Sequence, residues 1–246
     1  MARKLGPGIC VHCCKEVSLR NWDHVIPLSW YPNTTPEDLE KWKIPSCIRC
    51  NTEYGNLEND LLLRLGLCLD PQSLQSSGIS ERVLRSIRPE SAKSEKDRRS
   101  RAAKREHLLS EVFPVSEAIE GNLPGFGFEN ASGPRLAIPI PEQALLLFGE
   151  KIVRGVTYLE TNCTISEKYR INIHFVHDGD AVRVERILDR YAIKNSRGPG
   201  VEIERAQLAE DPVQGLFRVT IWGRFKLFAS VRHRIEYREA TGGGAV

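Results

Sequence analysis

The chain has 246 residues, of which 41% are hydrophobic and 27% are charged, an ordinary composition for a soluble globular protein. This length allows one large domain or two small ones. No uninterrupted run of about 18 apolar residues is present, so we expect no membrane span. The start MARKLGPGIC is basic but lacks the apolar segment of a secretory signal, so we expect a cytoplasmic protein.

The net charge of +3 is distributed unevenly along the chain. Residues 79–107 hold ten Lys/Arg and five Asp/Glu, whereas residues 1–78 hold eight and nine. A basic excess confined to one segment favours contact with a polyanion.

Three regions are predicted in chain order, and together they give an α+β protein. Residues 1–70 form a cysteine-containing unit that ends in the helical stretch YGNLENDLLLRLGL. Residues 71–140 combine a helix-prone charged run, interrupted at Pro89, with the stretch EGNLPGFGFENASGPRLAIPIP, whose Gly and Pro are typical of a linker. Residues 141–246 form a C-terminal α/β domain with an antiparallel sheet and no assigned role.

The charged run of the middle region has two interpretations. On a helix its cations would face a DNA phosphate backbone, without reading bases; they are Arg98, Arg99, Arg101, Lys104 and Arg105. The alternative is a solvated helix laced by salt bridges, because acidic residues are interspersed with the basic ones.

The C-terminal region carries clear secondary-structure signals. Pro141 and Glu142 suit a first helical turn before ALLLFGEKIVRGVTYLE, and DAVRVERILDRYAI is also helical. Strands are predicted for YRINIHFVH, GVEIERAQL, GLFRVTIWG and RFKLFASVRH, and disorder for the tail TGGGAV. We interpret His174, His177 and Asp178 as a strand end and a turn rather than a metal site.

Four of the seven cysteines form two CxxC pairs, Cys10 with Cys13 and Cys47 with Cys50. Thiolates two residues apart can reach one ion, and two such pairs complete a tetrahedral zinc site. Four sulfurs fill the coordination shell, so the predicted zinc is structural. Cys14 could exchange with Cys13 as a ligand, and the spacing favours Cys13.

Between the two pairs lies the stretch DHVIP, which begins at Asp23-His24, and Asn51 follows the second pair directly. Binding of one ion by both pairs would bring these residues together. Asp23 and the Asn51 oxygen are hard ligands that suit Mg²⁺ or Mn²⁺. His24 titrates near neutral pH and can accept a proton from water. A hard cation and a positioned base suffice for phosphodiester hydrolysis.

The ordered set CVHC, DHVIP and CIRCN resembles the HNH (ββα-metal) endonucleases of the four-cysteine kind, over residues 10–64. The resemblance implies a β-hairpin that carries Asp23 and His24 and a helix that starts near Asn51. It implies His24 as general base, with Asp23 and Asn51 as ligands of the catalytic cation. It also implies cleavage of DNA to 5′-phosphate and 3′-hydroxyl ends, one strand per site, so that a double-strand break needs a homodimer or two encounters.

One position departs from the family pattern. Trp42 stands where the family has its middle Asn, which braces the loop and orients the histidine, and Asn33 could substitute for it. The alternative function is therefore a zinc-stabilised nucleic-acid-binding module without catalysis, or a defence or mobile-element effector with a sensing C-terminal domain. Within this region we expect His12 to be solvated and Glu58 to lie on the exposed side of its helix.

Overall fold

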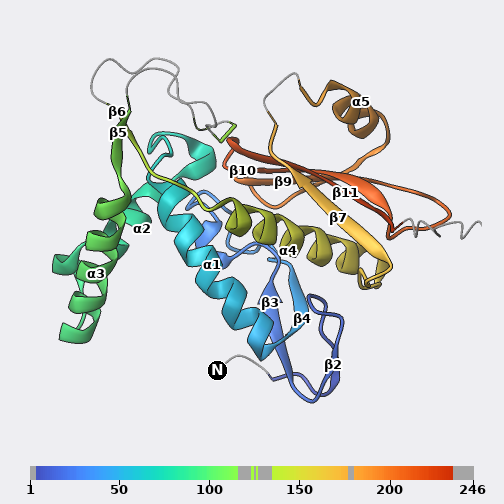
Figure 1. Cartoon of the computed structure of the whole chain (residues 1–246), viewed down its shortest axis with the longest axis horizontal. Coiled ribbons are helices and arrows are strands. Elements are labelled where there is room, and N and C mark those ends of the chain that lie inside the picture. Colours follow the sequence, from blue (N-terminus) through green and yellow to red (C-terminus); the bar gives the residue numbers. More distant parts are fainter. Residues whose placement is uncertain (1–3, 116–122, 125, 127–134, 177–179, 235–246) are drawn as a thin grey trace, which may run out of the picture.

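The computed structural model describes residues 4–115, 123–124, 126, 135–176 and 180–234. Within them the chain combines helices with an antiparallel five-stranded sheet, so the α+β class is confirmed (Figure 1). The tail TGGGAV, and the residues His177 and Asp178, lie outside the described residues.

The N-terminal part is a β-hairpin followed directly by a long helix. β3 (Arg20–His24) pairs antiparallel with β4 (Lys43–Cys47), and α1 (Ile48–Gly66) starts at the next residue. The short strands β1 (Gly8–Ile9) and β2 (Glu16–Val17) precede the hairpin, and the 3-10 turn η1 (Leu28–Trp30) lies between its strands. The local arrangement of a hairpin and a helix is as expected.

The middle part is helical and then extended. The predicted interruption at Pro89 is confirmed, because α2 (Ile79–Ser86) and α3 (Glu95–Glu111) are separate helices. The Ser94 side chain caps α3 by accepting from the Asp97 amide. Residues that were predicted as linker include β6 (Arg135–Ala137), which pairs with β5 (Phe113–Val115). Strand pairing between distant segments has no local signal, so the linker prediction was wrong at this point.

The C-terminal part is an antiparallel sheet with a helix on each face. The strand order is β7-β11-β10-β9-β8, where the strands are β7 (Tyr169–His174), β8 (Ile193–Ser196), β9 (Val201–Gln207), β10 (Gly215–Ile221) and β11 (Phe225–His233). α4 (Glu142–Thr161) covers one face and α5 (Val182–Tyr191) the other (Figure 1). Each predicted helix and strand is confirmed here, and β8 is an addition.

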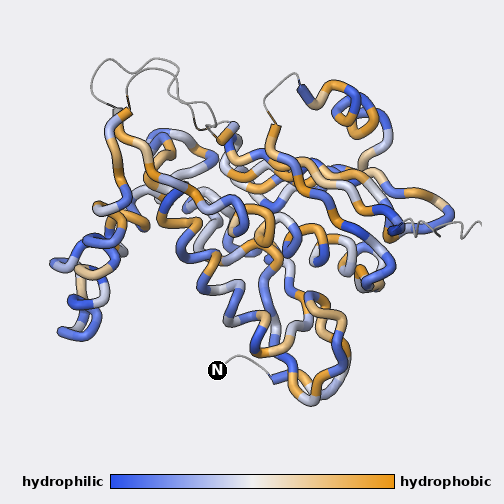
Figure 2. The backbone as a smooth tube through the Cα atoms, viewed as in Figure 1, coloured by the Kyte–Doolittle hydropathy of each residue, from blue (hydrophilic) through white to orange (hydrophobic). Residues whose placement is uncertain are grey.

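A single main core joins the N-terminal and C-terminal parts. It runs from Val11 to Val231, and hydrophobic residues gather where α4 meets the sheet (Figure 2). The turn between β10 and β11 reaches the N-terminal part, where the Trp222 ring stacks on Trp30 at 4.8 Å and its Nε1 donates to the Trp30 carbonyl at 2.7 Å. The region boundary at residue 140 therefore does not mark a break in packing.

α4 is the element that connects the hairpin to the sheet, and a glycine sets how closely it approaches. A Cβ on Gly155 would lie 2.6 Å from a methyl carbon of Val25, directly after β3. A side chain at this position would therefore require a shift of the helix or of Val25. α4 can thus place its neighbouring side chains against β3. No helix among the described residues is both long and apolar enough to cross a membrane.

Candidate metal centre and histidine site

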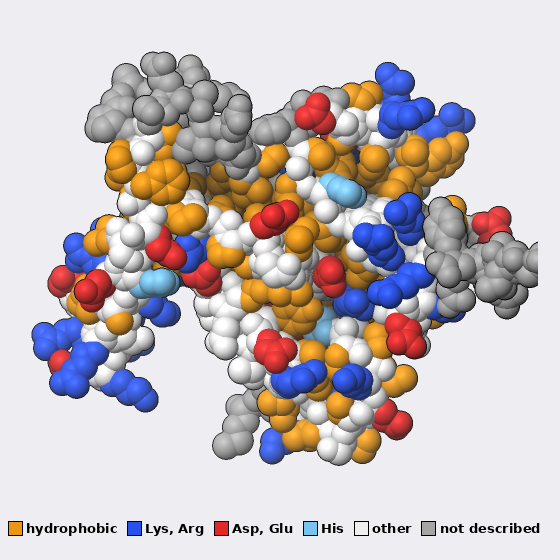
Figure 3. Space-filling view, in the orientation of Figure 1, with side chains coloured by type: hydrophobic (Ala, Val, Ile, Leu, Met, Phe, Trp, Pro, Cys, Tyr) orange, Lys and Arg blue, Asp and Glu red, His pale blue; other side chains and the backbone are white. Residues whose placement is uncertain are grey.

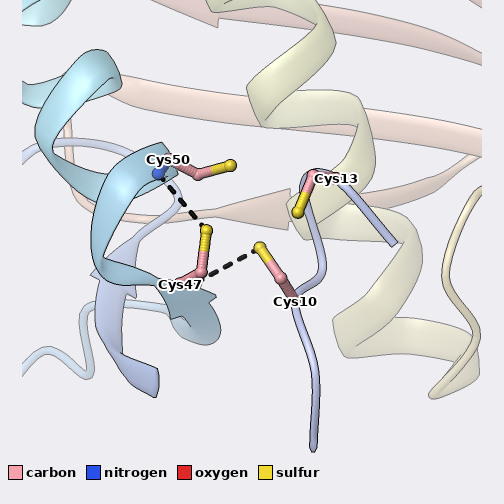
Figure 4. A group of neighbouring side chains, drawn as sticks. All are labelled: Cys10, Cys13, Cys47 and Cys50. Atoms are coloured by element: carbon pink, nitrogen blue, oxygen red, sulfur yellow. Dashed lines mark hydrogen bonds between the residues drawn. The ribbon is translucent and has the colours of Figure 1, made fainter. Parts of the chain in front are cut away.

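The four predicted cysteines converge on one point. The sulfur atoms of Cys10, Cys13, Cys47 and Cys50 all lie within 4.8 Å of one another, and the side chains face a common centre (Figure 4). Sulfurs around tetrahedral zinc are about 3.8 Å apart, given Zn–S bonds of about 2.3 Å. The donor set therefore fits a structural zinc ion, which would join the first knuckle to the start of α1.

Backbone amides support the sulfur atoms. The Cys47 amide donates to Cys10 Sγ at 3.2 Å, and the Cys50 amide donates to Cys47 Sγ at 3.4 Å. Although burial raises the pKa of Cys10, backbone N–H groups, that of Cys13 foremost, lower it to about 7. Cys14 takes no part, because its thiol donates to the Ile165 carbonyl at 3.2 Å. The group of four neighbouring sulfurs thus contains Cys13 and not Cys14.

The hairpin places Asp23 and His24 on opposite faces, since side chains alternate along a strand. Asp23 is paired with Ile44, and both are buried on the face towards α1 and α4. His24 is paired with Lys43, and both face the other way. The two residues of the DH motif therefore belong to different environments.

On the buried face, Asp23 belongs to an ionic cluster. One carboxylate oxygen accepts from His12 Nε2 at 2.8 Å and the other accepts from Lys151 Nζ at 3.2 Å. Lys151, on α4, has no exposed side-chain surface and also donates to the His24 carbonyl, at 2.7 Å, and to Glu58 of α1. Burial raises the pKa of Asp23, but the His12 hydrogen bond and the Lys151 charge hold it below its ordinary value overall.

Two side chains of this cluster correct the sequence predictions. His12 is only 5% exposed, and its ring packs on Tyr54 with centroids 4.6 Å apart, so it is not solvated. Glu58 is 8% exposed, and burial raises its pKa to about 7 against the opposing effect of Lys151. Both residues face inwards because α4 covers this side of the hairpin, which local sequence does not reveal.

Lys151 is not among the site residues that were predicted from the sequence. The helical stretch places Phe148, Ile152 and Val156 on one buried stripe, and Lys151 lies beside that stripe with no exposed surface. A lysine next to the apolar stripe of a helix is rarely buried without a partner. The position of Lys151 beside the apolar stripe is therefore the feature of the sequence that indicates a buried, paired lysine.

The residues expected to hold the catalytic cation do not fit one in this fold. Both Asp23 oxygens already accept hydrogen bonds, and the ammonium of Lys151 lies between Asp23 and Glu58. The Asn51 amide nitrogen donates to the Trp22 carbonyl at 3.3 Å, which places Asn51 beside β3 as expected. The arrangement offers a filled cation position, not a free one.

On the other face, His24 lines an open cleft of about 660 Å³. The cleft is bordered by aromatic, aliphatic and charged side chains, namely Trp22, Leu28, Leu39, Glu40, Lys41, Trp42, Lys43 and Leu159. Burial lowers the pKa of His24, the charge of Lys43 lowers it further, and Asp23 opposes both effects. These effects favour the neutral imidazole, which is the form that can accept a proton.

Neither Asn33 nor Trp42 provides a side-chain amide at the position of the middle Asn in the HNH pattern. The Asn33 Oδ1 accepts from Arg82 Nη2 at 2.8 Å, next to α2, so its side chain is engaged away from the cleft. Trp42 is buried under the guanidinium of Arg197, which lies 4.0 Å from the ring centroid. The Trp42 carbonyl accepts from the Val25 amide at 3.0 Å, so the backbone at this position holds the end of β3.

The basic helix α3 projects from the core and buries only Leu108 (Figure 1). Basic and acidic side chains alternate over its surface (Figure 3). Three of the predicted DNA-contacting cations lie in ion pairs within the helix: Arg98 and Arg99 with Glu95, and Arg101 with Asp97. Lys104 and Arg105 have no acidic partner among the described residues. The salt-bridged and DNA-contacting interpretations thus apply to different residues of one helix.

Searches against protein-family models, curated proteins and solved structures give no match to this chain.

Proposed function

We propose that the chain is an HNH-type endonuclease that hydrolyses phosphodiester bonds in DNA, with His24 as the general base. The observation that supports this function best is the His24 cleft. It combines a half-buried imidazole of lowered pKa with two lysines and an exposed aromatic ring, in a cavity large enough for a phosphodiester.

Each group of the cleft has a role in this proposal. His24 takes a proton from the water that attacks phosphorus, the bond from phosphorus to the 3′ oxygen breaks, and the leaving 3′ oxygen is protonated by solvent. Lys41 and Lys43 offset the negative charge that accumulates on the phosphate oxygens, and both interact electrostatically with the imidazole. Trp22 is 39% exposed at the rim of the cleft and offers a surface on which a base can stack.

The zinc ion has a structural role in this proposal. Bound by the four cysteines, it supplies no reactive group and joins the hairpin to α1. The Mg²⁺ or Mn²⁺ expected from the family resemblance stays a prediction. Because Asp23 is held by His12 and Lys151, the steps above use only side chains of the cleft.

A second candidate is a zinc-stabilised module that binds nucleic acid without cutting it. The occupied carboxylate of Asp23 favours this candidate, since a metal-dependent site needs that group free. The same lysines, together with Lys104 and Arg105 of α3, would then hold the phosphate backbone.

The test is nicking of supercoiled plasmid by zinc-loaded protein, with Mg²⁺, Mn²⁺ or EDTA, for the wild type and His24→Ala. Zinc content and the circular dichroism spectrum establish that both proteins are folded and that EDTA has not removed zinc. We expect nicking by the wild type and a loss of about 10²–10⁴-fold in the variant.

Binding measured by fluorescence anisotropy on the same plasmid-derived oligonucleotides separates the candidates. Binding without nicking, in every metal condition, would favour the second candidate. Equal nicking by the wild type and His24→Ala would remove His24 from the mechanism.

A further inference from the structure

A charged side chain from α4 contacts Asp23, one of the two residues that the resemblance gives as ligands of a metal ion. Lys151 Nζ contacts a carboxylate oxygen of Asp23, a carboxylate oxygen of Glu58 and the backbone carbonyl of His24. An ammonium group has three protons, and these three acceptors use all of them. The side chain of Lys151 has no exposed surface, and those of Asp23 and Glu58 are 6% and 10% exposed.

We propose that Lys151 is the built-in cation of this site, and that its removal uncovers a binding site for a hard divalent cation formed by Asp23, Glu58 and the His24 carbonyl. In the wild-type chain the ammonium keeps divalent ions away from Asp23.

The donor chemistry supports this exchange of one cation for another. Carboxylate and carbonyl oxygens are the ligands that Mg²⁺ and Mn²⁺ prefer. Two carboxylates that face each other in a buried site repel each other, and a positive charge between them or protonation of one of them relieves the repulsion. Lys151 supplies that charge, and a divalent ion can supply it once the long lysine side chain is gone.

The packing of α4 fixes the position of Lys151. Lys151 and Gly155 are one helical turn apart, and the contact of Gly155 with Val25 holds α4 against the end of β3. Lys151 and Asp23 are 128 residues apart in the sequence, and their side chains are in contact. Occupation of the cation position is therefore a consequence of how the C-terminal part packs on the hairpin.

The same lysine also bears on the proposed nuclease, although the inference does not depend on catalysis. By donating to the His24 carbonyl, Lys151 fixes the backbone at the end of β3 from which the imidazole projects into the cleft. Lys151 is thus a positioning residue for His24 if the proposed function holds.

The experiment is a titration of zinc-loaded full-length proteins with Mn²⁺ alone. Electron paramagnetic resonance measures the concentration of free Mn²⁺ at each step. Four proteins are compared: the wild type, Asp23→Asn, Lys151→Ala and the double variant Lys151→Ala with Glu58→Gln. We expect Lys151→Ala to bind one more Mn²⁺ per chain than the wild type. If the number of bound ions is equal, we expect the variant to bind Mn²⁺ at least about tenfold more tightly. The double variant should lose this gain, and Mg²⁺ should compete for the new site.

Two results obtained with folded proteins would overturn the inference. One is a wild-type Mn²⁺ site that disappears in Asp23→Asn, because the ammonium would then not exclude the ion. The other is a folded Lys151→Ala that binds no more Mn²⁺ than the wild type. If Lys151→Ala folds only when Mn²⁺ is added, the inference is supported, and if Mn²⁺ does not restore its folding, the inference is wrong. Plasmid nicking enters none of these readouts, so failure of the proposed function is seen separately.

Discussion

The two faces of β3 differ in almost every physical respect, although they begin at adjacent residues. On one face, Asp23 is buried in a cluster in which each of its carboxylate oxygens has a partner. On the other, His24 lines an open cleft beside Lys41 and Lys43. The buried face contributes to holding the hairpin on α1 and α4, and the open face is the one that a substrate can reach.

This difference shows how a two-residue motif can be divided by the strand that carries it. Adjacent strand residues point to opposite sides, so a shared metal site needs a strand end or a bend. Here the pairing of β3 with β4 continues to His24, which is opposite Lys43. The Asp-His pair is thus extended, and α4 covers the side on which Asp23 lies.

Zinc removal should have the largest effect on stability. The ion anchors the β3–β4 hairpin, and both faces of β3 depend on that hairpin. Structural zinc contributes about 10–16 kcal/mol of binding free energy in zinc-finger peptides. We expect one zinc per chain, and loss of zinc and of cooperative unfolding in Cys47→Ser. Zinc release with a chromogenic chelator and thermal denaturation measure both.

The matched control for zinc is Cys14→Ser, which changes a thiol next to the tetrad but outside it. Zinc content should stay at one per chain in this variant. A loss of zinc comparable with that in Cys47→Ser would show that Cys14 is a ligand and Cys13 is not.

Loss of the buried ammonium should come second. Lys151→Met leaves the carboxylates of Asp23 and Glu58 facing each other, and breaking a buried pair in this way costs about 3–5 kcal/mol. Adding Glu58→Gln removes one of the two charges and should restore part of the lost stability. Urea denaturation gives the free energies of unfolding, and a loss below about 1 kcal/mol would mean that the buried face is not held by this cluster.

Two helical glycines provide a third comparison. Gly155→Ala introduces a Cβ against Val25 and should destabilise the chain by about 1–3 kcal/mol. Gly55→Ala, in α1, has no heavy atom within 4 Å of the new carbon and should stabilise it by about 0.5–1 kcal/mol. Thermal unfolding of both variants checks this, and effects of the same sign would contradict the close approach of α4.

The open face should respond to charge rather than to packing. Lys43 lowers the pKa of His24, so Lys43→Ala should raise that pKa towards the ordinary value. A base works when it is deprotonated, so activity rises as the pH passes upwards through the His24 pKa. The acidic limb of the rate profile should therefore move to higher pH in Lys43→Ala, and a limb that moves to lower pH or stays in place would contradict this assignment.

The smallest effect is expected on α3. Lys104→Ala and Arg105→Ala each remove a cation without an acidic partner among the described residues, and each should reduce the salt dependence of DNA binding by about one unit of slope. Arg98→Ala is the control, because Arg98 is paired with Glu95 at 2.8 Å. Anisotropy titrations at several salt concentrations measure the slopes, and equal slopes for all variants would place DNA elsewhere.

The sequence predicted those features that depend on local pattern. The CxxC spacing identified the tetrad, and alternation and helical periodicity identified α4, β7 and β9–β11. What it could not predict depends on contacts between distant segments. The burial of His12 and Glu58 requires α4 to pack over the hairpin, and the pairing of β5 with β6 joins segments about 20 residues apart. Lys151 is an intermediate case. Its place beside the apolar stripe of α4 is visible in the local sequence, but its partner Asp23 is distant in the chain.

The most direct measurement compares the two histidines that mark the two faces of β3. Their ring nitrogens can be followed by long-range ¹H–¹⁵N correlation spectra while a short DNA oligonucleotide is added to the zinc-loaded protein. His24 lines the open cleft and His12 is buried against Asp23, so we predict that the His24 signals shift and the His12 signals stay in place. Shifts at His12 with an unchanged His24 would contradict the account, because DNA would then act on the face that the fold has closed.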